Sequence, residues 1–592
     1  MKKESAGTLI TRTFFRLLPI QILLAAIGAV NATVSGLFAS NSVGADAMSA
    51  IGLYNPINLL ANAICSLLVC GSQIICGKFM GANQMEKTQS VFSLDIFLAT
   101  LFSMFYALLH VVAVMFGWLG VFTKDPLVLE YLNQYALGRA IGILPYIIGQ
   151  QLAAFLSLEN RMGRTTIASV VFIVVNLITN YVFVAKLRMQ AFGLALASSV
   201  GLWVFMIVEI AHFFGKKSLL KIKFRNLRGA SIGEVIKIGL PGALGDAYQM
   251  VRGLICNALI MAFAFSAGMS ASSTVNSFLG MFWTIPGGML TVSRMLMAVS
   301  IGEQDRRSLT DVMRNMFKWC VPLMSIISAA IIILAEPITN LYYHVPTETV
   351  YRMTVWGFRI VPLSFPIAIV AMHATCYAQT SGKTVLVHVI SASDGFIAVS
   401  LVTWILMPFI SVNGYYVALV ASSTISVIIA LIYAIIKNRR LPRTMDEFMV
   451  IPASFGVDEK DHMDISLTTM EEVVTVSQSV MDFCKDRGID PKRTYLAGLS
   501  LEEMAGNVIE HGFAKKKGNH SVDIRVVNSK DDLILRIKDD CMPFNPVERM
   551  ELVGQGKNED QSKNIGIRMV YGIAKKMEYQ NILGMNVLTI HI

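Results

Sequence analysis

The chain has 592 residues, of which 54% are hydrophobic and only 15% charged, and its mean hydropathy is +0.58. A soluble globular protein is usually about one quarter charged, so this composition argues against one. The formal net charge of +10 is spread over loops between apolar stretches, which argues against nucleic acid as a partner. The eight cysteines show neither zinc-ligand spacing nor a disulfide framework.

Apolar stretches of roughly 20 residues, each long enough to cross the hydrocarbon layer, recur up to about residue 440. They predict an all-α polytopic membrane domain of about twelve helices. The first stretch lacks a convincing cleavage site and is interpreted as a retained helix. The expected helices cover residues 14–38, 51–78, 91–118, 134–157, 166–186, 193–215, 236–263, 272–299, 314–335, 354–378, 385–409 and 413–436.

Lysine and arginine residues are concentrated in alternate loops between these stretches. They occur in the N-terminal tail, in the loops after the second, fourth, sixth and eighth stretches, and after the last one. Because basic loops stay on the cytoplasmic side, we expect both termini in the cytoplasm and a multi-pass protein of the plasma (inner) membrane.

The membrane part contains an internal duplication. Leu18-Pro19 recurs as Leu240-Pro241, the Gly81 motif recurs at Gly302, and the pair Tyr131 and Arg139 recurs as Tyr351 and Arg359, all at spacings of 220 to 222 residues. The repeat predicts two six-helix lobes of equal orientation, residues 14–227 and 228–440, after an N-terminal tail of residues 1–13. Such lobes are typical of secondary transporters that bind substrate between repeats.

Two segments carry a family resemblance. Gly44–Leu53 and Gly71–Asn83 resemble the first two helices of the multidrug and toxic compound extrusion (MATE) family. The resemblance implies an antiporter that exports cationic or amphipathic compounds, xenobiotics among them, across the lipid bilayer on an ion gradient. Many members carry an acidic residue in the first helix where this chain has Ser35.

Ionisable residues within membrane helices are costly, so each is a functional candidate. The candidates for transport are Asp246, Asp394, Arg139 and Arg359. The two arginines have the alternative of extending to the membrane interface. The two aspartates could bind a cation or a proton, or pair with an arginine such as Arg294.

After Leu441-Pro442 the chain becomes polar, and residues 441–460 are expected to form a linker. Residues 461–592 predict an α+β domain with one mixed sheet and helices on one face. The expected strands cover residues 462–467, 521–528, 533–538, 578–583 and 587–592. The expected helices run to about residue 487 from a capping box at Thr468 and Glu471, over 491–512, and over 564–576.

Three elements of this domain carry chemistry. Glu503, Asn507 and His511 are spaced four apart and are expected on one helix face, where an amide oxygen can bind Mg²⁺ and a carboxylate can act as a base. Asp539-Asp540 directly follows a strand. The segment from Asn564 to Gly566 opens a helix whose N–H groups can hold phosphate.

These elements, in this order, resemble the Bergerat-type ATPases, and within them the anti-sigma-factor serine kinases. The resemblance implies an ATP-binding sandwich with ATP and Mg²⁺ as cofactors. It implies that Asn507 holds Mg²⁺, that Asp539 and Asp540 lie at the adenine, that Gly566 contacts phosphate, and that Glu503 activates a substrate serine. The partner it implies is a cytoplasmic protein of the anti-anti-sigma (STAS-like) type.

Two residues depart from the family pattern, because Cys541 and Asn564 stand where glycine is usual. Two hypotheses follow from the whole chain. In the first, the transporter-like body senses or moves a solute and the tail binds Mg-ATP and phosphorylates, or only binds, a partner protein. In the second, the body is an ion-driven exporter of small molecules or cations and the ATP-binding tail is its regulatory gate.

Overall fold

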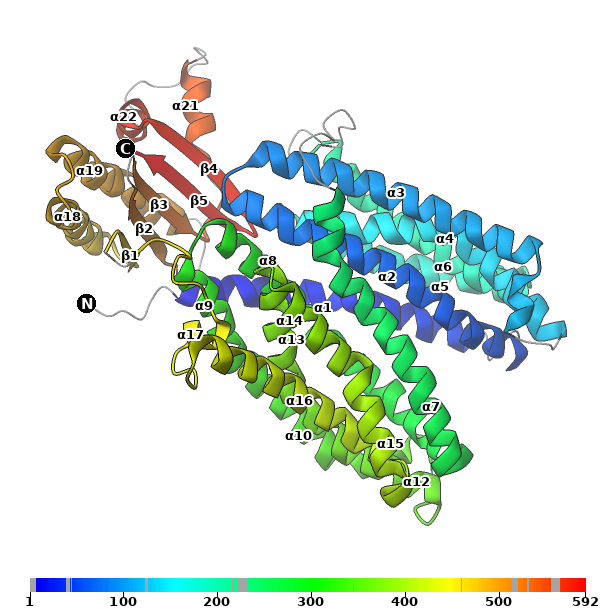
Figure 1. Ribbon diagram of the computed structural model, residues 1–592. Coiled ribbons are helices and arrows are strands. Elements are labelled where there is room, and N and C mark those ends of the chain that lie inside the picture. The colour runs from blue at the N-terminus through cyan, green and yellow to red at the C-terminus, as the bar shows by residue number, and fades with distance from the viewer. Residues whose placement is uncertain are drawn as a thin grey trace.

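The computed structural model describes residues 7–38, 43, 45–122, 126–215, 218–221, 232–343, 345–458, 460–513, 520–529, 532–554 and 565–592. It contains a helical membrane body and a C-terminal α+β domain (Figure 1). The first lobe consists of α1 (Gly7–Phe38), α2 (Ala45–Gly81), α3 (Met85–Met115), η2 (Trp118–Val121), α4 (Pro126–Leu158), α5 (Met162–Asn180), η3 (Tyr181–Lys186) and α6 (Gln190–Phe213).

The second lobe repeats this arrangement with more interrupted helices. It consists of α7 (Ile232–Phe282), α8 (Thr284–Gly302), α9 (Arg306–Asn315), η5 (Met316–Cys320), α10 (Val321–Ile333), α11 (Ala335–Asn340), α12 (Thr349–Ile360), η6 (Val361–Leu363), α13 (Ser364–Thr380), α14 (Thr384–Ala392), η7 (Ser393–Ile397), α15 (Ala398–Ile410) and α16 (Asn413–Asn438).

Each of the twelve stretches expected from hydropathy lies on helix. Within the described ranges, ten helical segments are long and apolar enough to cross a membrane. The remaining two stretches lie in α1 and in the first part of α7, which is interrupted by a non-helical residue at Phe265. Large apolar side chains on α3, such as Met104, Phe105 and Leu108, are more than half exposed, as expected for side chains that face lipid.

Backbone geometry repeats with the duplication. Asn83 and Gln304 both have positive φ, 60° and 53°, directly after α2 and α8. Asn160 and Gly382 follow α4 and α13 with φ of 57° and 78°. Because few side chains adopt positive φ, the recurrence at the repeat spacing supports two lobes descended from one unit.

The lobes meet backbone to backbone along α2. A Cβ on Gly302 would lie 2.1 Å from the carbonyl oxygen of Lys78, and one on Gly239 would lie 1.9 Å from that of Leu67. A Cβ on Gly81, the repeat equivalent of Gly302, would clash with the carbonyl oxygen of Val299. In Figure 1 the lobes converge beside the C-terminal domain and diverge toward the opposite end. The body is therefore closed on the side of that domain.

The segment expected as a linker is packed against the membrane body. It contains α17 (Met445–Met449), and Met449 is buried in the core of the body. Lys383 donates to the carbonyl oxygens of Met449 and Val450, at 2.7 and 2.8 Å. Arg306 pairs with Asp446 at 3.0 Å. These contacts fix the exit direction of the chain from α16.

The C-terminal domain has one sheet in the order β1-β2-β3-β5-β4. All pairings among its described strands are antiparallel, so the expectation of a mixed sheet was wrong. The strands β4 and β5 form a hairpin whose two turn residues, Leu583 and Gly584, have φ of 53° and 75°, as tight hairpins require. The strands are β1 (His462–Leu467), β2 (Val522–Asn528), β3 (Leu533–Asp539), β4 (Lys576–Ile582) and β5 (Met585–His591).

Helices cover one face of this sheet, as expected. They are α18 (Met470–Asp486), α19 (Pro491–Asn507), η8 (Val508–Gly512), α21 (Pro546–Gly554) and α22 (Ile565–Ile573). The capping box of α18 uses Thr469 and Glu472, one residue later than expected. The Glu472 carboxylate also accepts from the hydroxyl of Thr468.

Candidate functional site

Asp539, the expected adenine-contacting residue, ends β3 and is buried. Its Oδ1 accepts from the backbone N–H of Cys541 at 2.8 Å and from Asn586 at 2.7 Å. Asn586 is in turn fixed by Tyr579, which donates to its Oδ1 at 2.7 Å. Burial raises the pKa of Asp539, and the bond from Asn586 partly offsets the rise. The carboxyl group is thus held in one orientation by β5, a support that sequence reasoning missed.

Glu503 and Asn507 lie on α19, and Gly566 lies in the first turn of α22. A Cβ on Gly566 would lie only 1.7 Å from Oε2 of Glu503. The carboxylate therefore abuts the N-terminal end of α22, where the helix dipole favours negative charge. In this arrangement a larger residue at position 566 would displace the Glu503 side chain, and two of the expected site residues are in direct contact.

Glu503, Asn507 and His511 were expected on one helix face, and the structure keeps only part of this face. The chain after Asn507 continues as the π-helical turn η8, which adds a residue per turn and rotates the following side chains. His511 is exposed. Asn564 lies outside the described residues.

The second face of the sheet is polar and meets the membrane body. Arg525 on β2 and Lys538 on β3 point away from the helices and reach the turn between α8 and α9. Lys538 Nζ lies 2.5 Å from Glu303 Oε2 and 3.1 Å from Asp305 Oδ2. Arg525 Nη1 lies 2.7 Å from Asp305 Oδ1. Sequence reasoning missed this buried ionic cluster.

Charge holds Asp305 and Lys538 in their ionised forms at neutral pH. Burial alone would raise the pKa of Asp305, but Lys538 and Arg525 outweigh it and hold that pKa well below its usual range. Burial alone would lower the pKa of Lys538, but Glu303 and Asp305 outweigh it and raise that pKa. The contribution of Asp305 is therefore complete above about pH 4, and that of Lys538 is lost only in strong alkali, above about pH 10.

A second set of contacts joins the domain to α1 and α4. Arg12 on α1 lies 3.4 Å from Asp540 and donates to Ser521 at 2.7 Å. At the β4–β5 hairpin, Arg16 donates to the carbonyl oxygen of Leu583, whose N–H donates to the carbonyl oxygen of Leu158. The domain thus contacts both lobes on the side where they are closed, and one contact involves the residue next to Asp539.

Asp523 lies on β2, beside the contacts with the membrane body, and the pH dependence of stability tests whether its carboxyl group is buried. Its carboxylate accepts from Ser466 at 2.6 Å, and burial raises its pKa to about 7. A raised carboxyl pKa favours the folded state at low pH, and this contribution is lost as pH rises toward 7. The unsubstituted protein should lose on the order of 2 kcal/mol of stability between pH 5 and pH 8 because Asp523 ionises, and the Asp523→Asn variant should not show this loss. Thermal unfolding of the full-length protein at both pH values measures this.

The exposed Asp482 on α18 provides the matched control, since its side chain is 58% exposed. The Asp482→Asn variant should keep the pH dependence of the unsubstituted protein. Equal pH dependence in Asp523→Asn and the unsubstituted protein would contradict the expectation.

The four membrane candidates lie in different places. Arg139 on α4 donates to Asn58 of α2 at 3.1 Å, inside lobe 1. Arg359 pairs with Glu336 at 2.7 Å, and both side chains are substantially exposed. Asp394 accepts from Ser422 at 3.0 Å. The side chains of Asp246 and Ser35 lie outside the described residues.

Sequence reasoning missed two buried acidic residues of lobe 1. Asp95 on α3 and Glu209 on α6 are fully buried, and Asp95 accepts a hydrogen bond from Ser72 of α2. A lone acidic residue inside an apolar stretch was the available signal.

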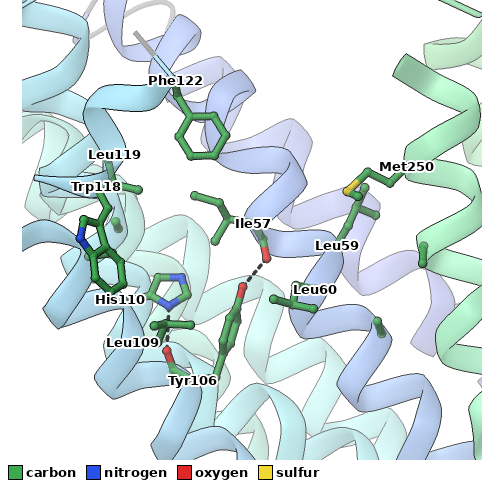
Figure 2. Close-up of a pocket in the computed structure, with 14 residues that line it drawn as sticks. Ile57, Leu59, Leu60, Tyr106, Leu109, His110, Trp118, Leu119, Phe122 and Met250 are labelled. Atoms are coloured by element: carbon green, nitrogen blue, oxygen red, sulfur yellow. Dashed lines mark hydrogen bonds between the residues drawn. The ribbon is translucent and has the colours of Figure 1, made fainter. Parts of the chain in front are cut away.

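A cavity of about 470 Å³ lies between α2 and α3 of lobe 1 and the first part of α7 (Figure 2). Its lining is almost entirely apolar and includes Leu60, Leu109, Trp118, Phe122 and Met250. His110 and Tyr106 line it too, and Tyr106 donates to the carbonyl oxygen of Ile57 (Figure 2). The cavity is suited to an apolar or aromatic group.

Comparison with known families identifies both parts. Residues 11–182 and 241–405 match the MatE family, and residues 444–592 match the histidine kinase-like ATPase domain. Because the first match covers more than half of the chain, the protein belongs to the MatE family. It is a MatE transporter domain fused to a C-terminal histidine kinase-like ATPase domain.

Solved structures agree with the fold of the membrane body. They include a MATE protein in complex with MaL6, an outward-facing multidrug resistance MATE transporter, and a MOP superfamily transporter from Pyrococcus furiosus described as having a binding pocket of reverse polarity. Each is 15% identical, has a TM-score of 0.67, and covers 73% of this chain and 98% of its own. At this identity the likeness shows the fold alone. No curated protein matches the chain.

Proposed function

We propose that the protein is a small-molecule transporter whose exchange between open and closed lobes is controlled by Mg-ATP binding to its C-terminal domain. The observation that carries the proposal is that this domain contacts both lobes on their closed side. In the orientation indicated by the basic loops, that side is cytoplasmic. Cytoplasmic ATP would thus bind on the side of the membrane where the lobes are in contact.

The nucleotide would bind between α19 and α22. Asn507 would hold Mg²⁺, Asp539 would accept from the adenine amine, and the N–H groups at Gly566 would contact phosphate. Bound phosphate would compete with the Glu503 carboxylate for the N-terminus of α22. The resulting movement of α22 and of the loop after β3 would reach Arg12 through Asp540.

The transported compound would place an apolar group in the lobe 1 cavity, which favours an amphipathic substrate. Arg139 and Asp394 remain candidates for its charged group or for the coupling ion, as does Asp246. Arg359 is a weaker candidate because its partner Glu336 lies with it at an exposed surface.

Reconstituted full-length protein tests the gate. We expect ATP with Mg²⁺ on the domain side to change the rate of substrate counterflow, and a non-hydrolysable analogue to do the same, because binding alone moves the contact. The Asn507→Ala variant should transport at the basal rate, and nucleotide should not change that rate. Equal rates with and without nucleotide in the unsubstituted protein would overturn the proposal.

ATP binding itself is a separate prediction. We expect calorimetry of the full-length protein to show one Mg-ATP site. The Asp539→Asn variant should lose at least about 2 kcal/mol of binding free energy, because the adenine amine would face the amide N–H group of asparagine where a carboxylate oxygen accepted its hydrogen bond. The exposed pair of Lys575 and Asp532, at the other end of β3, provides a control, and Asp532→Asn should bind normally. Normal binding by Asp539→Asn would remove Asp539 from the site.

A second function is phosphorylation of a serine on a partner of the anti-anti-sigma type. The contact of Glu503 with Gly566 supports it, because a base beside the phosphate end of the site could activate an incoming hydroxyl. Labelled ATP incubated with the protein and such partners tests it. Label transfer that is lost in Glu503→Gln would establish the kinase, and a lack of both transfer and co-purification would reject it.

A further inference from the structure

Three potential metal ligands converge beside the loop that follows β3. His520 precedes β2, Asp540 and Cys541 follow β3, and one ligand atom from each lies within 4.8 Å of the others. The three residues are 5 to 8% exposed. His520 Nδ1 lies 3.0 Å from Asp540 Oδ1, which aligns the two groups. Their position is distinct from Asn507, the residue proposed to hold Mg²⁺.

The ligand types select the ion. A thiolate, an imidazole nitrogen and one carboxylate oxygen form a mixed set that suits Zn²⁺ and is poorly matched to Mg²⁺ or Ca²⁺, which prefer oxygen alone. Three protein ligands also leave a fourth position for water. The other oxygen of Asp540 faces Arg12, so the ion would share this carboxylate with a cation of the membrane body.

Charge is compatible with such a site. Binding would convert the Cys541 thiol to a thiolate, with the proton passing to solvent as the metal–sulfur bond forms. The thiolate and the Asp540 carboxylate then carry two negative charges against the two positive charges of the ion, and Arg12 remains as the outer neighbour. The imidazole of His520 binds in its neutral form.

We propose that His520, Asp540 and Cys541 form a Zn²⁺ site that joins the loop between Asp539 and the contact with Arg12 to the start of β2. This assignment gives a role to a cysteine at a position where glycine would be expected. The cysteine side chain reaches the end of η8, where a Cβ on Gly512 would lie 3.2 Å from Sγ of Cys541. The metal would therefore join the segments before β2 and after β3, next to the end of η8, independently of whether the domain binds nucleotide.

The test uses full-length protein in detergent, stripped with chelator and kept free of nucleotide. Zn²⁺ alone is titrated against a chromophoric chelator, and Co²⁺ alone is added to a second sample. We expect one Zn²⁺ per chain, release of about one proton, and a sulfur-to-cobalt charge-transfer band in the Co²⁺ spectrum. The Cys541→Ser variant should lose the band and weaken Zn²⁺ binding by at least about 100-fold, since it removes a direct ligand.

The buried Cys484 of α18 lies in the same domain and outside the cluster, so Cys484→Ser is the matched control and should keep both band and affinity. The His520→Asn variant provides a second measurement if Cys541→Ser does not fold, and it should weaken Zn²⁺ binding while keeping the band. Failure of the unsubstituted protein to bind Zn²⁺ stoichiometrically, or an unchanged affinity in His520→Asn, would overturn the proposal.

Discussion

Replacing Lys538 with methionine is expected to detach the ATP-binding domain from the membrane body while each part stays folded. The change leaves Glu303 and Asp305 buried with one cation fewer, and loss of one partner from a buried ion pair costs on the order of 3–5 kcal/mol. The domain has a hydrophobic core of its own, and only Ile582, Leu583 and Met585 of its hairpin belong to the core of the body, so that cost falls on the docked state. Hydrogen exchange measured by mass spectrometry should rise in the turn between α8 and α9 and remain low in α19.

Lys575 provides the control for this prediction. It pairs with Asp532 on the same domain, but its side chain is 55% exposed, and an exposed pair contributes only about 0–1 kcal/mol. The Lys575→Met variant should therefore leave exchange unchanged. The double variant Lys538→Met with Glu303→Gln should regain part of the docking, because it removes one unpaired carboxylate. Identical exchange in Lys538→Met and the unsubstituted protein would show that the cluster does not hold the domain.

The sequence contained the elements of this interface but not their pairing. Arg525 and Lys538 alternate with the apolar residues of their strands, which predicts a polar second face of the sheet. Their partners Glu303 and Asp305 precede them by more than 200 residues. No local periodicity connects such distant positions, so the sequence could indicate a polar face without showing that it is buried.

The membrane body shows the same division between local and long-range information. Hydropathy predicted where helices lie, because each stretch must satisfy its backbone within itself. The repeat of Gly81 and Gly302 was visible, but its meaning, close contact between the lobes, needed the structure. In the candidate nucleotide site, Glu503 and Gly566 were expected to serve one nucleotide, but their direct contact was not expected. Asn586, which orients Asp539, had no motif to identify it.

The lobe contact leads to the second large effect. In Gly239→Ala the new methyl group would lie 1.9 Å from the carbonyl oxygen of Leu67, so α2 and α7 must separate. Such overpacking costs about 1–3 kcal/mol, and 1.4 kcal/mol is a tenfold shift in population. The buried thiol of Cys70 lies at the same contact, beside Gly242, and reports on it. We expect its labelling by a small maleimide, followed by peptide mass spectrometry, to accelerate about tenfold.

Gly253, also on α7, provides the control. Gly253→Ala changes helix propensity in the same way as Gly239→Ala but does not crowd a neighbouring helix. A Cβ there would have no heavy atom within 4 Å, so Gly253→Ala should leave Cys70 protected, and equal labelling in both variants would contradict the prediction. Because the ATP-binding domain contacts both lobes, its docking and the lobe contact are linked reciprocally. Lys538→Met should therefore also raise Cys70 labelling, and Gly239→Ala should raise exchange in the turn between α8 and α9. If only one of these effects occurs, the domain rests on the lobes without controlling them.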